Sequence, residues 1–129
     1  MGTKYLKVTV RPNLYDPQCP TRTVLDRIGD KWTVLVVLTL LDGPQRFSRL
    51  RDRIGGVAPK VLTQTLRSLE RDGIVTRTAF AEIPLRVEYE LTPLGRSLEE
   101  PIRSIAVWSE SHMPSITRAR TAYDRRADG

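Results

Sequence analysis

Two amphipathic stretches joined by a glycine pair restrict the possible folds of this chain more than any other feature. Residues 47–54 read FSRLRDRI and residues 59–71 read PKVLTQTLRSLER, with a Gly-Gly pair between them. Both stretches repeat apolar residues at helical spacing, and Pro59 suits the first turn of the second one. We expect Ser48 to cap the shorter helix and Gly73 to end the longer one. A short helix, a tight turn and a longer helix predict a helix-turn-helix.

The part of the chain before this pair predicts two further helices. Residues 4–10 alternate apolar and polar side chains and suit an edge strand. Pro20 begins a helix that ends near Ile28, and residues 30–43 predict a second helix that is apolar nearly all round. Such a helix is expected at the centre of the core or in a subunit interface.

The part after the pair predicts a hairpin and a long helix. Residues 74–80 and 86–91 form two extended stretches, and the second alternates apolar with charged residues, as a half-buried strand does. A helix then starts after a Thr92 cap and kinks at Pro101. Three helices backed by a two-stranded hairpin predict a winged helix-turn-helix, which is mainly α with a small β-hairpin wing.

The longer helix of the pair carries the functional prediction. At about 100° per residue, Leu62, Leu66 and Leu69 gather beside Thr65 and face the core. The opposite face carries long hydrogen-bonding side chains: Lys60, Gln64, Arg67 and Arg71, with Thr63 at its margin. Gln pairs with adenine and Arg with guanine in a major groove, while Lys and Thr reach bases or phosphates. The pattern therefore predicts a recognition helix for DNA.

The charge balance and the predicted wing point to the same partner. The chain of 129 residues has a formal net charge of +6, and a domain this basic is a candidate for binding nucleic acid. Arg77 and Arg86 lie on the hairpin and would flank the recognition helix, and Ser48 and Arg49 are further expected contacts. We predict binding to double-stranded DNA. The alternatives are a merely solvated helix face, and a winged-helix module that binds protein or RNA.

Three segments together resemble those that mark HxlR-type winged-helix transcriptional regulators, relatives of the MarR group. They are CPTRTVLDRIGDKWT, RFSRLRDRIGGVAPKVLTQTLRSLERDGIVTR and RVEYELTPLGRSL. The resemblance covers residues 19–112, which we expect to form the domain, between an N-terminal extension (1–18) and a C-terminal helical segment with a charged tail (113–129). It implies bacterial regulation, often repression, by a homodimer that is built from its terminal helices and binds a two-fold-related operator.

Two positions depart from the pattern of this family. Ala58 stands where such proteins often carry a serine that caps the recognition helix. Without this serine, the helix lacks a capping hydrogen bond that contributes about 1 kcal/mol to its stability. Leu85 stands where the wing commonly reads Pro-Pro-Arg, so we expect a looser wing tip.

Cys19 is the single cysteine of the chain. With Pro20 in the first helical turn, we expect Cys19 at the N-cap, where the positive end of the helix and Arg22 favour the thiolate. Some family members sense oxidants or electrophiles through a cysteine at this position. The alternative is a small apolar residue packed at a helix start. A thiol-redox enzyme ranks last, because neither a second cysteine nor a histidine is supplied nearby.

An apolar stripe on the terminal helices is expected to form core or dimer interface. Its members are Trp32, Leu98, Ile102, Ile105 and Trp108. The two tryptophans could instead line an effector pocket, but aromatic residues on apolar helices more often pack in a core or an interface.

Other classes of protein receive no support from the sequence. His112 has no neighbouring ligands at metal spacing, and neither a phosphate-binding loop nor a catalytic motif occurs, so we expect no metal, no cofactor and no enzyme. The sequence contains neither a secretory signal nor an apolar run that would span a membrane. We therefore expect a cytoplasmic protein associated with the nucleoid.

Overall fold

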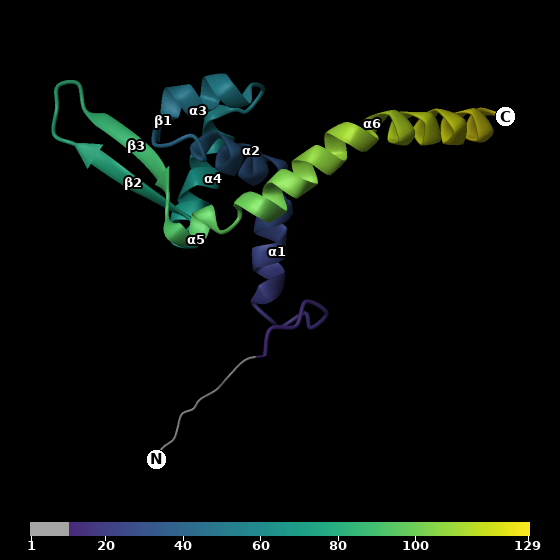
Figure 1. Cartoon of the computed structure of the whole chain (residues 1–129), viewed down its shortest axis with the longest axis horizontal. Helices are drawn as coiled ribbons and strands as arrows, with labels where there is room; N and C mark the ends of the chain where they lie inside the picture. Colours follow the sequence, from purple (N-terminus) through teal and green to yellow (C-terminus); the bar gives the residue numbers. More distant parts are fainter. Residues whose placement is uncertain (1–10) are drawn as a thin grey trace, which may run out of the picture.

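Short helices form the body of the molecule, and a hairpin and a long helix project from it in different directions (Figure 1). The structure, a computed structural model, describes residues 11–129. The edge strand expected at residues 4–10 lies outside them. In chain order the elements are α1 (Thr21–Gly29), α2 (Lys31–Leu40), β1 (Gln45–Arg46), α3 (Phe47–Ile54), α4 (Pro59–Arg71), β2 (Val75–Phe80), β3 (Arg86–Leu91), α5 (Pro93–Arg96) and α6 (Glu99–Asp128).

Helix α2 lies at the centre of the body because its apolar side chains leave it little surface suited to water. Val36, Val37 and Leu40 are fully buried, and the helix contacts α1, α3, α4, α6 and β3. Side chains from the other elements complete the core: Leu50, Val57, Leu62, Leu66, Leu69, Ile74, Val75, Leu91 and Ile102. The predicted central position of this helix is confirmed.

The predicted hairpin is present and is extended by a third strand. β2 and β3 pair antiparallel along their whole length, with Val75 opposite Leu91 at the base. β1 pairs with the other edge of β3, with Arg46 opposite Glu88, so the strand order is β1-β3-β2. A strand of two residues is too short to show a periodic pattern, and the sequence did not predict it.

Two helices begin at positions other than those predicted. The N-cap of α1 is Pro20, so Cys19 lies one residue before the cap and not at it. The N-cap of α3 is Arg46, whose extended backbone belongs to β1, and the helix starts directly at Phe47. Ser48 therefore lies inside the first turn and does not cap the helix. That prediction is wrong because pairing with β3 fixes where the extended backbone ends.

The kink predicted at Pro101 is replaced by a break between two helices. The C-cap of α5 is Ser97 and the N-cap of α6 is Leu98, so Pro101 lies in the first turn of α6. A proline there removes no hydrogen bond, because N–H groups of the first turn have no partner inside the helix. Pro114 lies inside α6, and the axis of this helix changes direction along its length (Figure 1).

The short helix α5 secures the base of the hairpin. The hydroxyl of Thr92 accepts the N–H of Gly95 at 3.0 Å and donates to the carbonyl of Gly73. A Cβ on Gly95 would collide with the carbonyl oxygen of Ile74, which directly precedes β2. The Thr92 cap is thus confirmed, and α5 packs against the backbone from which the hairpin starts.

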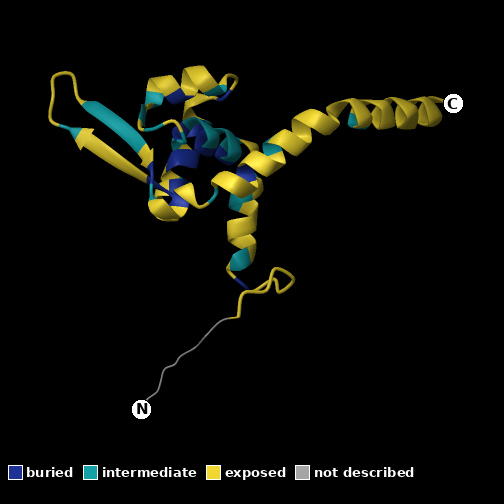
Figure 2. Cartoon of the chain, viewed as in Figure 1, coloured by how far each residue is buried: buried dark blue, intermediate teal, exposed yellow. Residues whose placement is uncertain are grey.

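Burial distinguishes the body from the first and last helices (Figure 2). In the described chain, α1 contains no fully buried residue, and Ile102 is the buried residue of α6. The boundary expected after residue 112 falls within α6, which is continuous from Glu99 to Asp128. No helix within residues 11–129 is long and apolar enough to cross a bilayer.

Candidate nucleic-acid interface

Helix α4 has a sharply divided surface. Leu62, Leu66 and Leu69 are at most 1% exposed, and Thr65 is buried beside them. This face packs on α2 and β2, which fixes the rotation of the helix about its axis. Pro59 is at the first helical position, and the N-cap Ala58 offers no side-chain hydrogen bond. The helix is therefore oriented by its buried leucines and not by a polar cap.

The opposite face of α4 is open to solvent. Four of its five predicted DNA-contacting residues are exposed: Lys60, Gln64, Arg67 and Arg71. Thr63, at the margin of this face, is partly buried. Within residues 11–129, none of the three basic members forms a salt bridge. Long side chains without a partner in the protein are free to bind a phosphate or a base edge.

A groove of about 440 Å³ separates α4 from the wing. Its lining brings together Thr63 and Arg67 of α4 with Arg77 and Tyr89 of the hairpin. Glu70 lines the same groove, and an acid was not predicted there. On the helical wheel Glu70 lies only about 20° from Thr63, so the wheel could have predicted an acid at that margin of the basic face.

Helix α3 adds a second basic surface. Ser48 and Arg49 are exposed on it, as the sequence predicts for residues that flank the recognition helix. Arg46, Arg51 and Arg53 are exposed as well, and sequence reasoning did not single them out. The high density of arginine in RFSRLRDR was the sequence feature that could have predicted this basic surface.

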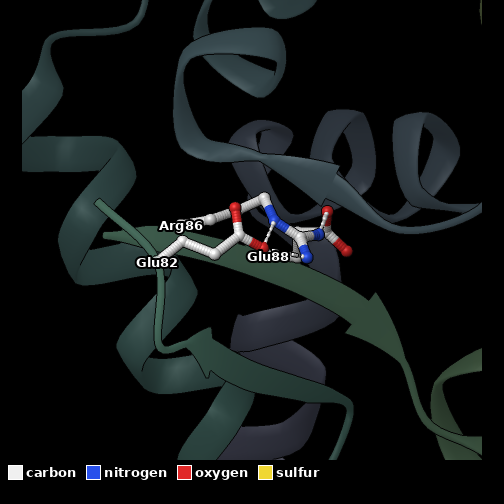
Figure 3. A network of polar contacts seen from close by, with 3 residues as sticks. All are labelled: Glu82, Arg86 and Glu88. Atoms are coloured by element: carbon white, nitrogen blue, oxygen red, sulfur yellow. Dashed lines mark hydrogen bonds and ion pairs between the residues drawn. The ribbon is translucent and has the colours of Figure 1, made fainter. Parts of the chain in front are cut away.

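The two wing arginines differ in their surroundings. Arg77 on β2 is exposed, whereas Arg86 is held by two carboxylates (Figure 3). Its Nε and Nη2 atoms lie 2.9 and 2.7 Å from the carboxylate of Glu82, and its Nη1 atom lies 2.5 Å from that of Glu88. The guanidinium also lies 3.8 Å from the centre of the Phe80 ring.

These contacts shift the pKa values of Glu82 and Arg86. The hydrogen bonds from Arg86 lower the pKa of Glu82, and those to Glu82 and Glu88 raise the pKa of Arg86. Arg86 was predicted near the wing tip, but its two carboxylate partners were not predicted. Their spacing, four residues before and two residues after Arg86, was the signal that could have found them.

Cys19 lies under the segment that precedes α1. The residue is 5% exposed, and its Sγ atom lies 3.4 Å from the backbone nitrogen of Asn13 and 3.2 Å from Oγ1 of Thr21. The hydrogen bond with the Thr21 hydroxyl, followed by those with backbone N–H groups of Asn13 and Thr21, lowers the pKa of the thiol. These groups, and not the expected Arg22, favour the thiolate.

The predicted apolar stripe is divided between core and surface. Ile102 is fully buried, and Trp32 and Leu98 pack against the core. Ile105 and Trp108 are 50% and 56% exposed. The two tryptophans line different surface grooves, so they do not share an effector pocket.

Comparison with known proteins gives this architecture a family. A family model described as HxlR-like helix-turn-helix matches residues 27–117. The chain is also 44% identical over 115 residues to YtfH of Escherichia coli strain K12, an uncharacterized HTH-type transcriptional regulator, and the match covers 89% of each protein.

Solved structures agree with the sequence matches. YtfH from Salmonella typhimurium is 40% identical, with a TM-score of 0.81 over 86% of this chain and 99% of that one. The redox regulator HypR in its oxidized form is 40% identical, with a TM-score of 0.67 over 72% of this chain and 96% of that one. The winged-helix prediction is confirmed, and the chain belongs to the HxlR-like helix-turn-helix family of transcriptional regulators.

Proposed function

We propose that the protein is a homodimeric, sequence-specific repressor that reads a two-fold-related operator through α4. The observation that carries the proposal is the division of α4 into a leucine face in the core and an exposed face that is free of acids along its centre. A helix with this division, after a tight turn and beside a hairpin, suits insertion into a major groove.

The position of each residue along α4 indicates its role. Lys60, Thr63 and Gln64 are near the start of the helix and reach deepest, with Gln64 suited to adenine. Arg67 follows one turn later and suits guanine, while Arg71 near the end contacts a phosphate. Ser48, Arg49 and Arg77 contact the backbone on either side.

A dimer would cover apolar surface on the first and last helices. Val24 and Leu25 of α1 and Ile105, Val107 and Trp108 of α6 are about half exposed or more. Helix α6 has 30 residues, and such a helix is about 45 Å long. Apolar side chains spaced along a helix that extends from the body favour a partner helix, and a second copy of the chain supplies one.

Cys19 is proposed to make DNA binding sensitive to oxidants. The lowered pKa of its thiol increases the thiolate fraction, and the thiolate is the form that oxidants attack. Two Cys19 thiolates of a dimer would give two electrons to the oxidant and form a disulfide, or one would accept oxygen as a sulfenate. Because the residue is 5% exposed, residues 11–18 must first move aside.

The proposal is tested with DNA from upstream of the protein's own gene. We expect a nuclease footprint of two protected half-sites whose centres are about 10 base pairs, or a multiple, apart. Binding to RNA or to another protein, without a protected palindrome in duplex DNA, would favour the alternative winged-helix module.

The proposed oxidant sensitivity of DNA binding is tested separately, with Cys19→Ser as the control variant. Diamide or hydroperoxide should weaken operator binding of the wild-type protein and leave the variant unaffected. An equal response of the two proteins would place the switch elsewhere.

A further inference from the structure

Arg86, the second arginine of the wing, already has binding partners within the protein. Its guanidinium uses three nitrogen atoms on Glu82 and Glu88 and covers the ring of Phe80. A phosphate could replace these carboxylates only if the contacts on both sides were broken. Arg86 therefore differs from Arg77, which is exposed on the neighbouring strand.

The charge of the wing also argues against a phosphate contact there. Residues 75–91 contain two arginines, Arg77 and Arg86, and three glutamates, Glu82, Glu88 and Glu90, a net charge of −1. Because Arg86 is paired with two of these acids, Arg77 is the available cation among the described residues of the wing. Across the sheet, Arg46 faces Glu88 in the strand register and also lowers the pKa of Glu82, so this end of the hairpin is a mixed cluster of charges.

The contacts of Arg86 span the loop that joins the two strands. Glu82 lies in this loop, Phe80 ends β2, and Glu88 lies within β3. One planar guanidinium thus links both sides of residues 81–85. Lysine carries the same charge but has a single side-chain nitrogen. It cannot at once donate two hydrogen bonds to Glu82 in a bidentate arrangement, donate a third to Glu88 and stack on the ring of Phe80.

The loop held in this way presents an apolar tip. Ile83 is fully exposed and Leu85 is 64% exposed. Apolar side chains at such positions contact sugars or wedge into a minor groove in many DNA-binding proteins. Their placement relative to α4 depends on the order of the loop.

We infer that Arg86 is a positioning residue that orders the wing loop 81–85 for contact with DNA, and that it does not itself neutralise a phosphate. The inference rests on the proposed function, because it concerns how the wing serves the DNA interface. It assigns phosphate neutralisation by the wing to Arg77.

The test compares Arg86→Lys with Arg86→Gln, on the full chain. A phosphate contact would survive the lysine substitution, since lysine binds phosphate as a point charge. A structural clamp would not. We expect both variants to bind the operator about 10-fold more weakly than wild type, which corresponds to ordering roughly one loop residue on binding. The salt slope of Arg86→Lys should equal that of wild type.

A second measurement follows the loop without DNA. Backbone ¹⁵N relaxation should give order parameters for Ala81, residue 82, Ile83 and Leu85 that fall from about 0.85 toward 0.6 in Arg86→Lys and in Glu82→Gln/Glu88→Gln. The double variant keeps the arginine and removes its partners. Unchanged loop order in both proteins would overturn the inference, as would wild-type operator affinity in Arg86→Lys.

Arg67→Ala separates this inference from the proposed function. If Arg67→Ala binds duplex DNA as wild type does, the DNA-reading role of α4 fails. If Arg67→Ala is weakened while Arg86→Lys is not, only the positioning role of Arg86 fails.

Discussion

Helix α4 and the wing border the same groove, but they hold their arginines in different ways. Arg67 and Arg71 extend from α4 without a carboxylate partner among the described residues, whereas Arg86 of the wing lies between two glutamates. The backbone of α4 is fixed from behind by leucines in the core. The wing loop has no core beneath it and is held by surface charges.

Under the proposed function, the same residue type would serve recognition in α4 and geometry in the wing, according to what fixes the backbone. Where apolar packing already orients an element, its basic side chains are free for a ligand. Where packing is absent, an arginine that binds several groups at once can hold the backbone in place. On this proposal, the number of arginines around the groove exceeds the number of phosphate contacts that they make.

The largest expected effect comes from the buried face of α4. Leu66→Ala should lower the free energy of unfolding by about 2–5 kcal/mol, because it leaves a cavity in the core. Chemical denaturation measures this loss, and Arg67→Ala on the adjacent exposed position is the control. Equal destabilisation by the two substitutions would contradict the division of α4 into a structural and a reading face.

A smaller loss of stability is expected at the base of the wing. Thr92→Ala removes the cap of α5 and its bond to Gly73, and should cost about 1 kcal/mol in the free energy of unfolding. Thr78→Ala, on an exposed position of β2, is the matched control. If both variants unfold at the same denaturant concentration, α5 does not secure the hairpin.

The salt dependence of binding sharpens the contrast within the wing. Arg77→Gln should weaken binding to all sequences alike and reduce the slope of log affinity against log salt by about 0.9, the value for one phosphate contact. Fluorescence anisotropy at several salt concentrations gives the slope. Arg120→Gln, an exposed arginine on α6, makes the same change of charge away from the interface. A slope that falls equally in both variants would reflect net charge only.

The smallest effect is a pH dependence of the wing loop. The hydrogen bonds from Arg86 lower the pKa of Glu82 in the folded protein. Its contribution to the stability of the loop is therefore fully present above the pKa of the unfolded chain, and is lost as the pH falls through the lowered pKa of the folded protein. The amide chemical shifts of the loop residues other than Pro84, and that of Arg86, should move in that acidic range. In Glu82→Gln this step should be absent, and its persistence would assign the titration to another group.

The sequence predicted those parts of the molecule that a local pattern determines. Both faces of α4 follow from helical periodicity, and the Thr92 cap follows from the residues directly after it. The start of α3 could not be predicted in this way, because pairing of Arg46 with a strand more than forty residues away decides it. The break before α6 and the cover over Cys19 also depend on tertiary packing.

The site was predicted unevenly for the same reason. Exposure of Lys60, Gln64 and Arg67 required only the period of one helix. The surroundings of Arg86 required the conformation of a loop, which brings Glu82 and Phe80 to the same side chain. Charge patterns in the sequence identify basic residues but do not show which of them are already paired.

The central claim is that the exposed face of α4 reads bases. It is tested most directly by measuring the affinities of wild type and Arg67→Ala for an operator and for its single-base-pair variants. We expect Arg67→Ala to lose about 1–3 kcal/mol of binding free energy on the operator and to discriminate no longer at one position in each half-site. A uniform loss at all positions, or no loss, would contradict it.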